Sequence, residues 1–374
     1  MSAARFGETE YEGPLLEVTD LETFFETDRG LVRAVDGVSF TLERGKTIGI
    51  VGESGSGKTV LSRSIMNLQP KRGVVRSGSV KFEGKDLLGL SDRQMRAYWG
   101  AQMSMIFQDP MTSLNPVMKI GKQITESIRE HLEVSRDYAL ELAESLLSSV
   151  RIPEPTRRLK DYPHQLSGGM RQRVCIAVAL ACGPKLLFAD EPTTALDVTV
   201  QAQVLDLVQQ QQRERFMSVV LITHDLGVVA GRADEIVVMY AGRVVEKAPT
   251  SVLFTDMKMP YTEALLSSIP KLDEASHTRL ATIPGRPPDL VSPPPGCKFA
   301  PRCAYVQEKC LEEEPPLVPS GKPDHEFRCW FPVGTPEGKE AFERNRRAGL
   351  ITAAALAGEA PPQAVDDTVS VTST

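Results

Sequence analysis

Gly52-Glu-Ser-Gly-Ser-Gly-Lys-Thr59 is the segment that decides the fold, because it follows a short apolar strand predicted at 47–51 and precedes a helix predicted at 60–68. Small residues let backbone N–H groups approach phosphate oxygens closely, and the helix start adds a favourable dipole. We expect Lys58 to reach the β- and γ-phosphates and the Thr59 hydroxyl to ligate Mg²⁺. The other predicted phosphate-binding residues are Gly52, Ser54, Gly55, Ser56 and Gly57. A glycine-rich turn that binds nothing is the alternative, but strand, loop and helix occur in the order that a nucleotide site requires.

A second apolar strand, Leu186-Leu-Phe-Ala-Asp-Glu191, ends in two carboxylates. Such a strand can carry acids from a dry sheet to a metal ion and an attacking water. Asp190 is expected to support Mg²⁺ through its coordination shell, and Glu191 to polarise the water as a general base. Standing alone, the two acids would fit a solvated turn or a helix cap equally well. Beside the phosphate loop, they indicate nucleotide hydrolysis.

A second phosphate-binding helix start is predicted at Leu166-Ser-Gly-Gly-Met170, where Ser167, Gly168 and Gly169 precede a helical run at 171–181. One domain cannot easily build a site from two such helix ends. A head-to-tail dimer can, with each phosphate loop facing the serine-glycine motif of the other subunit. We therefore expect a second subunit of the same kind, identical or related.

Taken together, these motifs resemble the ATP-binding cassette (ABC) of transporters over about residues 15–257. The resemblance implies an α/β fold: a P-loop NTPase cassette with an antiparallel β subdomain and a helical subdomain, using ATP and Mg²⁺. By the same resemblance, Gln108 would touch Mg²⁺ and the attacking water and report to the membrane partner. His224 would contact the γ-phosphate, and Asp197 would link the two sites of the dimer. Phe25 would stack on adenine, although Phe24 beside it is an alternative.

Each of these roles has a plainer alternative. Gln108 could be an exposed polar residue before a turn, and His224 a structural histidine at a strand end. Asp197 could simply cap the helix predicted from residue 198.

Two longer segments point to a subgroup of the family. Ser167-Gly-Gly-Met-Arg-Gln-Arg173 and Phe107-Gln-Asp-Pro-Met-Thr-Ser-Leu-Asn-Pro116 resemble the cassettes of bacterial dipeptide, oligopeptide and nickel importers. Met170 replaces the glutamine of many cassettes, and we expect hydrolysis to tolerate this because the phosphate contacts come from Ser167 and backbone N–H groups. The resemblance implies an ATPase that energises import of di- or oligopeptides.

A cysteine-containing extension follows the cassette. Cys297, Cys303, Cys310 and Cys329 are spaced C-x5-C-x6-C-x18-C in a proline-rich stretch with little apolar content. The segments Gly296-Cys-Lys-Phe-Ala-Pro-Arg-Cys303 and Arg328-Cys329 resemble the C-terminal extension of the same subgroup, some members of which hold a [4Fe-4S] cluster there. By this resemblance we expect the four cysteines to hold a [4Fe-4S] cluster, and the absence of close C-x2-C pairs argues against a simple zinc ribbon. Zn²⁺ bound by the four thiolates and free thiols are the alternatives.

The chain therefore divides into a nucleotide-binding domain at 14–257, with a helical subdomain at about 109–183, and an extension at 258–335. A charged helix and a disordered tail are expected at 336–374. The net charge of −6 argues against nucleic acid as a partner, and no apolar run is long enough for a membrane helix. We expect the chain on the cytoplasmic face of the plasma membrane, bound to two permease subunits and linked only indirectly to an extracytoplasmic solute-binding protein.

Other functions are possible within the same fold. Nickel or another small solute could be the cargo. A cassette acting on nucleic acid or ribosomes would need either a long coiled coil between the motifs or two cassettes in one chain, and neither pattern is present. An exporter would share the catalytic residues but would not be expected to carry the importer-like segments.

Overall fold

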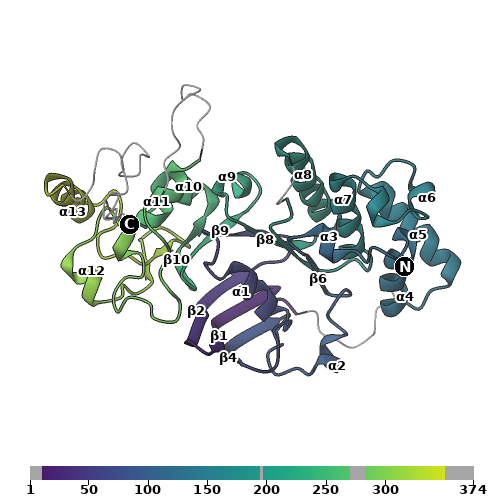
Figure 1. Cartoon of the computed structure of the whole chain (residues 1–374), viewed down its shortest axis with the longest axis horizontal. Coiled ribbons are helices and arrows are strands. Elements are labelled where there is room, and N and C mark those ends of the chain that lie inside the picture. The colour runs from purple at the N-terminus through teal and green to yellow at the C-terminus, as the bar shows by residue number, and fades with distance from the viewer. Residues whose placement is uncertain (1–10, 194–196, 270–282, 350–374) are drawn as a thin grey trace, which may run out of the picture.

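An eight-stranded sheet runs through the middle of the molecule and carries the phosphate loop at the end of an inner strand (Figure 1). The computed structural model describes residues 11–193, 197–269 and 283–349. The strands of this sheet are β3 (Thr47–Val51), β6 (Met103–Ile106), β7 (Leu186–Asp190), β8 (Ser218–Thr223), β9 (Glu235–Tyr240), β10 (Arg243–Pro249), β11 (Val318–Pro319) and β12 (Glu326–Phe327). Their order is β11-β12-β10-β9-β3-β8-β7-β6, and β9, β3, β8, β7 and β6 are mutually parallel. The parallel strands are short apolar runs because both faces of the sheet are covered.

A smaller antiparallel sheet packs against the main sheet across helix α1 (Figure 1). Its strands, in the order β2-β1-β4-β5, are β1 (Leu16–Thr27), β2 (Gly30–Leu42), β4 (Val74–Phe82) and β5 (Lys85–Asp86). Helix α1 (Lys58–Ile65) buries Leu61 and Ile65 in the core that the two sheets share. Thr23 of β1 donates a hydrogen bond of 2.8 Å to Ser64 of α1, so the helix behind the phosphate loop is tied to the second sheet.

Helices gather at the end of the main sheet near β6 and β7 (Figure 1). They are α3 (Pro110–Ser113), α4 (Ile120–His131), α5 (Arg136–Ser149), α6 (Pro155–Arg158), η1 (Pro163–Gln165), α7 (Gly168–Ala179) and α8 (Val198–Arg215). Two short helices lie elsewhere: α2 (Asp92–Met95) lies near the smaller sheet, and α9 (Leu226–Val229) follows β8 and lies near β9. In α4, Ile120, Ile124 and Ile128 are all fully buried, and their spacing of four gives the helix one apolar face. The predicted α/β architecture with antiparallel and helical parts is confirmed. Within the described residues, no helix combines the length and apolar character needed to cross a membrane.

The extension is built onto the main sheet. Helix α10 (Thr250–Asp256) ends the cassette, and the extension comprises α11 (Pro260–Ser267), η2 (Ala300–Arg302), α12 (Glu308–Glu312), β11 and β12. Helix α13 (Pro336–Arg347) follows, where the sequence predicts a charged helix. Strand β12 pairs antiparallel with β10, with Phe327 opposite Glu246, and β11 pairs with β12. The extension therefore continues the sheet of the cassette. The tail predicted to be disordered lies largely outside the described residues.

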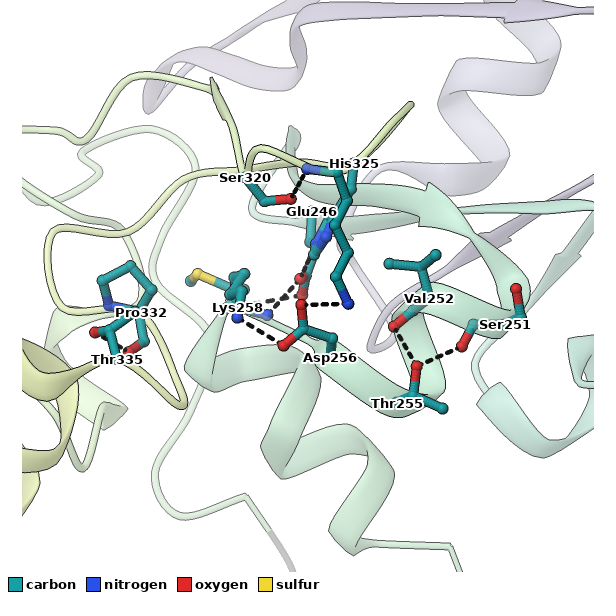
Figure 2. A network of polar contacts seen from close by, with 12 residues as sticks. Glu246, Ser251, Val252, Thr255, Asp256, Lys258, Ser320, His325, Pro332 and Thr335 are labelled. Atoms are coloured by element: carbon teal, nitrogen blue, oxygen red, sulfur yellow. Dashed lines mark hydrogen bonds and ion pairs between the residues drawn. The ribbon is translucent and has the colours of Figure 1, made fainter.

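A buried carboxylate and a buried histidine fix this junction (Figure 2). The side chains of Glu246 and His325 are both fully buried, and His325 Nε2 lies 2.9 Å from Glu246 Oε1. The same carboxylate accepts hydrogen bonds from the backbone N–H groups of Lys258 (2.5 Å) and Met259 (3.2 Å). One side chain on β10 thus holds both the start of the extension and the turn that leads into β12.

We expect His325→Ala to lower the free energy of unfolding by about 3 kcal/mol, because it leaves the buried Glu246 carboxylate without its side-chain partner. Urea denaturation of the full chain measures the change. The matched control is Arg344→Ala, which removes exposed contacts with Glu340 and Gln307 and should leave stability unchanged. Equal stability of the His325 and Arg344 variants would contradict this account of the junction.

Candidate functional site

The phosphate loop is packed so closely that only glycine fits at two of its positions. A Cβ atom on Gly57 would lie 2.2 Å from the carbonyl oxygen of Ala34, and one on Gly52 would lie 2.2 Å from the carbonyl oxygen of Met239. Gly57 also has a φ of 103°, a backbone conformation that favours glycine. It stands at the N-cap of α1 and has no side chain with which to cap the helix, so the first-turn N–H groups face the loop and suit a phosphate.

Lys58 lies inside this loop. Its side chain is buried, and its Nζ atom donates to the carbonyl oxygens of Gly52 (2.7 Å) and Glu53 (2.9 Å). Burial lowers the pKa of Lys58, while nearby carboxylates oppose that shift. The loop carbonyls therefore hold the ammonium inside the phosphate loop, where a cation could contact bound phosphate.

The two predicted magnesium-side residues are in direct contact. The Thr59 hydroxyl donates a hydrogen bond of 3.0 Å to Asp190 Oδ1. Burial raises the pKa of Asp190, and the hydrogen bond from Thr59 opposes the rise. A hydroxyl and a carboxylate oxygen side by side are the kind of hard ligands that Mg²⁺ takes, usually with water and phosphate oxygens completing its shell.

Three predicted catalytic residues meet around the Glu191 carboxylate. Gln108 Nε2 donates to Glu191 Oε2 at 3.1 Å, and His224 Nδ1 lies 3.4 Å from Glu191 Oε1. They come from three neighbouring parallel strands, since Gln108 follows β6, Glu191 follows β7 and His224 follows β8. Glu191 has a φ of 45°, and its backbone N–H donates to Ile222 of β8. Strain of this kind commonly accompanies functional sites, and the role of the carboxylate in orienting a water stays a prediction.

The serine-glycine motif forms a separate helix start. Ser167 caps α7 by accepting a hydrogen bond from the N–H of Met170 at 3.3 Å, and Gly168 and Gly169 form the first turn. Asp197 caps α8 by accepting a hydrogen bond of 2.9 Å from the N–H of Val200. This is the helix-capping role given above as the plainer alternative. Residues 194–196 lie outside the described residues. The contact of this motif with ATP bound to a second subunit stays a prediction.

Strand alternation separates the two candidate adenine-stacking residues. Phe24 lies opposite Arg33, whose guanidinium stands 5.6 Å from the centre of the Phe24 ring. Phe25 is two residues beyond the buried Thr23, on the face of β1 that turns toward α1. This placement favours Phe25, and its stacking role stays a prediction.

The four cysteines of the extension surround one small pocket. Cys297, Cys303, Cys310 and Cys329 all line it, together with aromatic and proline side chains. Burial raises the pKa of all four thiols, that of Cys297 to about 11. Within the described ranges, however, no three or more His, Cys, Asp or Glu side chains are grouped closely enough to hold a metal ion. The predicted cluster therefore has no metal geometry to support it, and the shared pocket is what remains in its favour.

Two further contacts reach the phosphate loop from the extension. The Arg302 guanidinium donates to both carboxylate oxygens of Glu53, at 2.6 and 2.9 Å, and the Tyr261 hydroxyl accepts from the Glu53 N–H at 2.8 Å. Sequence reasoning missed both residues. Arg302 lies within the segment singled out for its cysteines, but no local pattern indicates an acid 249 positions away.

Comparison with known proteins agrees with this geometry. Residues 35–194 match the ABC transporter family, and residues 245–310 match the C-terminal region of oligopeptide/dipeptide transporters. The chain is 52% identical over 318 residues to the oligopeptide transport ATP-binding protein OppD of Bacillus subtilis, an alignment that covers 85% of this chain and 88% of that protein. The chain belongs to the ATP-binding proteins of ABC transporters.

Other relatives of this ABC ATPase agree. It is 50% identical over 318 residues to the dipeptide transport ATP-binding protein DppD of Bacillus subtilis, covering 85% of this chain and 94% of DppD. Among solved structures, the dimeric ABC transporter cassette MJ0796 matches with a TM-score of 0.57 and 25% identity, covering 63% of this chain and 98% of that cassette. An ATPase coupled to transport, with ATP and Mg²⁺ as its cofactors, is the activity of this family.

We expect Glu191→Gln to bind ATP normally and to lower hydrolysis by about 100-fold or more, because the amide cannot accept a proton from water. Phosphate release by the assembled transporter and binding of a fluorescent ATP analogue measure the two effects. Glu130→Gln, at an exposed residue of α4, is the matched control and should match wild type in both. Normal hydrolysis by the Glu191 variant would remove the general-base assignment.

Proposed function

We propose that this chain energises the import of di- or oligopeptides across the plasma membrane, acting from the cytoplasmic face while bound to two permease subunits. The main support is the cassette joined to an extension of the oligopeptide/dipeptide transporter type, together with relatives named for oligopeptide and dipeptide transport. An extracytoplasmic solute-binding protein would deliver the cargo, so the peptide itself need not touch this chain.

Each cassette supplies half of two ATP sites. The phosphate loop, Thr59 and Asp190 bind one ATP with Mg²⁺, and Phe25 stacks on its adenine. Ser167, Gly168 and Gly169 at the start of the partner's α7 close over the phosphates, where backbone N–H groups and the helix dipole favour negative charge. ATP then closes the dimer because it binds the closed form better than the open form, and hydrolysis removes that preference.

The catalytic cluster links this cycle to the membrane. Glu191 activates the water, His224 contacts the γ-phosphate, and Gln108 touches Mg²⁺ and the water. Gln108 directly follows Phe107, a partly exposed residue that lines an apolar pocket of about 360 Å³ between β6 and α7. A permease segment seated on this pocket would bear on Phe107, and so on the contact between Gln108 and Glu191. We place the permease at this pocket.

Uptake measurements test the cargo. Deleting the gene in its native host should abolish uptake of labelled di- and tetrapeptides, and the wild-type gene should restore it. The gene carrying Glu191→Gln should not. Loss of nickel uptake with peptide uptake intact would favour the alternative cargo and overturn the proposal.

We also propose that the four cysteines of the extension hold a [4Fe-4S] cluster. All four line one pocket, and their sequence spacing lacks the close C-x2-C pairs of a simple zinc ribbon. A bound cluster would also supply the positive charge needed to ionise thiols whose burial raises the pKa.

Anaerobically purified protein should contain about four iron and four sulfide per chain. Cys297→Ser should lose the iron together with the visible absorption. Cys175→Ser, in the buried face of α7 and away from this pocket, is the matched control and should keep both. One zinc per chain, or no metal, would contradict the cluster and leave the ATPase assignment intact.

A further inference from the structure

A short segment of the extension grips the phosphate loop. The Arg302 side chain is only 3% exposed, and its two terminal nitrogens donate to both oxygens of the Glu53 carboxylate. Its other donors are used as well: Nε donates to the carbonyl oxygen of Pro284 at 2.8 Å, and Nη1 lies 3.3 Å from the Tyr240 hydroxyl. A guanidinium held on several sides has one orientation, and a bidentate pair fixes its carboxylate partner as well.

Glu53 connects this grip to the phosphate-binding lysine. Its carbonyl oxygen accepts a hydrogen bond from Lys58 Nζ, and its N–H donates to the fully buried Tyr261. The rings of Tyr261, Tyr240 and Phe299 pack together with centroids 4.6 to 5.3 Å apart. Side chain and backbone of one loop residue are thus both held by residues of the extension or of its packing core.

A second anchor from the same segment holds the back of the loop. Lys298 Nζ lies 2.9 Å from Asp36 Oδ2 and donates to the carbonyl oxygen of Ala241 at 3.1 Å. The next residue, Gly242, donates its N–H to the carbonyl oxygen of Ser56 in the phosphate loop at 3.0 Å. One end of segment 297–303 therefore contacts the loop through Arg302, and the other end contacts residues packed behind the loop through Lys298.

Charge gives the Arg302 contact a further effect. Glu53 lies in a loop that binds polyphosphate, and an uncompensated carboxylate there would repel ATP. Arg302 pairs with that carboxylate in a partly buried setting, where water screens the charges less than at the surface.

We propose that residues 297–303 act as a clamp on the phosphate loop and that Arg302 is a positioning residue for ATP binding. Arg302 orients Glu53 and neutralises its charge, and through Glu53 it keeps Lys58 and the loop backbone in the arrangement that receives phosphate. Cys297 and Cys303 are the first and last residues of this segment. The packing of the cysteine pocket therefore sets the position of the clamp. The proposal rests on ATP binding by the cassette, and it depends neither on the peptide cargo nor on a bound cluster.

Nucleotide affinity of the full chain tests the proposal. Arg302→Gln should weaken binding of a fluorescent ATP analogue by about tenfold, the order expected when one charge-assisted contact is lost. Adding Glu53→Gln to this variant should restore part of the affinity, because the unpaired carboxylate is then gone. Arg302→Lys keeps the positive charge but has a single donor nitrogen. Its affinity for the analogue should lie between those of wild type and Arg302→Gln.

Arg328→Gln is the matched control. Arg328 precedes Cys329 as Arg302 precedes Cys303, but it donates to the carbonyl oxygens of Val244 and Pro315 and not to the loop. Thermal melting measures any loss of stability in this variant, and its ATP affinity should stay at the wild-type value.

Three results would overturn the clamp: unchanged affinity in folded Arg302→Gln, equal losses in the Arg302 and Arg328 variants, or a further loss in the double variant with Glu53→Gln. If Arg302→Gln does not fold, Arg302→Lys decides, and wild-type affinity in that variant together with wild-type affinity in Glu53→Gln counts against the clamp. Lys58→Ala, which removes the loop cation, sets the scale for lost phosphate binding. A wild-type chain that bound no ATP would instead refute nucleotide binding itself.

Discussion

The parallel pairing of β3 with β8 and β9 is the constraint on which the site depends. In-register ladders, with Val51 opposite Thr223 and Val238, bring the carboxyl ends of the parallel strands to one edge of the sheet. The phosphate loop, Asp190, Glu191 and His224 all leave from that edge. A shift of one residue in any of these strands would move its terminal side chain away from the others, because successive side chains point to opposite faces. The positions of the predicted catalytic side chains relative to one another therefore depend on the register of the sheet.

Packing of backbone against backbone then fixes the loop itself. Gly57 and Gly52 let the loop lie directly on the carbonyls of Ala34 and Met239, which belong to different sheets. The loop is therefore wedged between the two sheets, and the extension adds polar contacts from a third side through Glu53. A nucleotide would meet a loop whose shape is already set, so less ordering free energy would be lost on binding.

Much of the fold and the centre of the site could be predicted from sequence, because the signals are local. Apolar runs ending in Gly52, in Asp190 or in His224 identify both a strand and the chemistry at its end, and parallel strands then bring those ends together. Phe25 needed the strand to be built before its face was known. Arg302 and His325 could not be predicted, since their acidic partners lie 249 and 79 positions away and only the tertiary fold brings the charges together. The cysteine spacing predicted a metal cluster, whereas the described residues place the four cysteines around one pocket without a metal-binding group.

The pairing of β12 with β10 protects the edge of the main sheet. Without the extension, β10 would become the last strand of the sheet and present a row of unpaired backbone N–H and C=O groups, a template for association with other chains. As it stands, the outermost strand β11 has only two residues, one of them Pro319, which has no N–H to offer a neighbour. The extension thus also serves as a terminal cap on the sheet, so a cassette cut off after α10 would be prone to aggregation even with every ATP-binding residue intact.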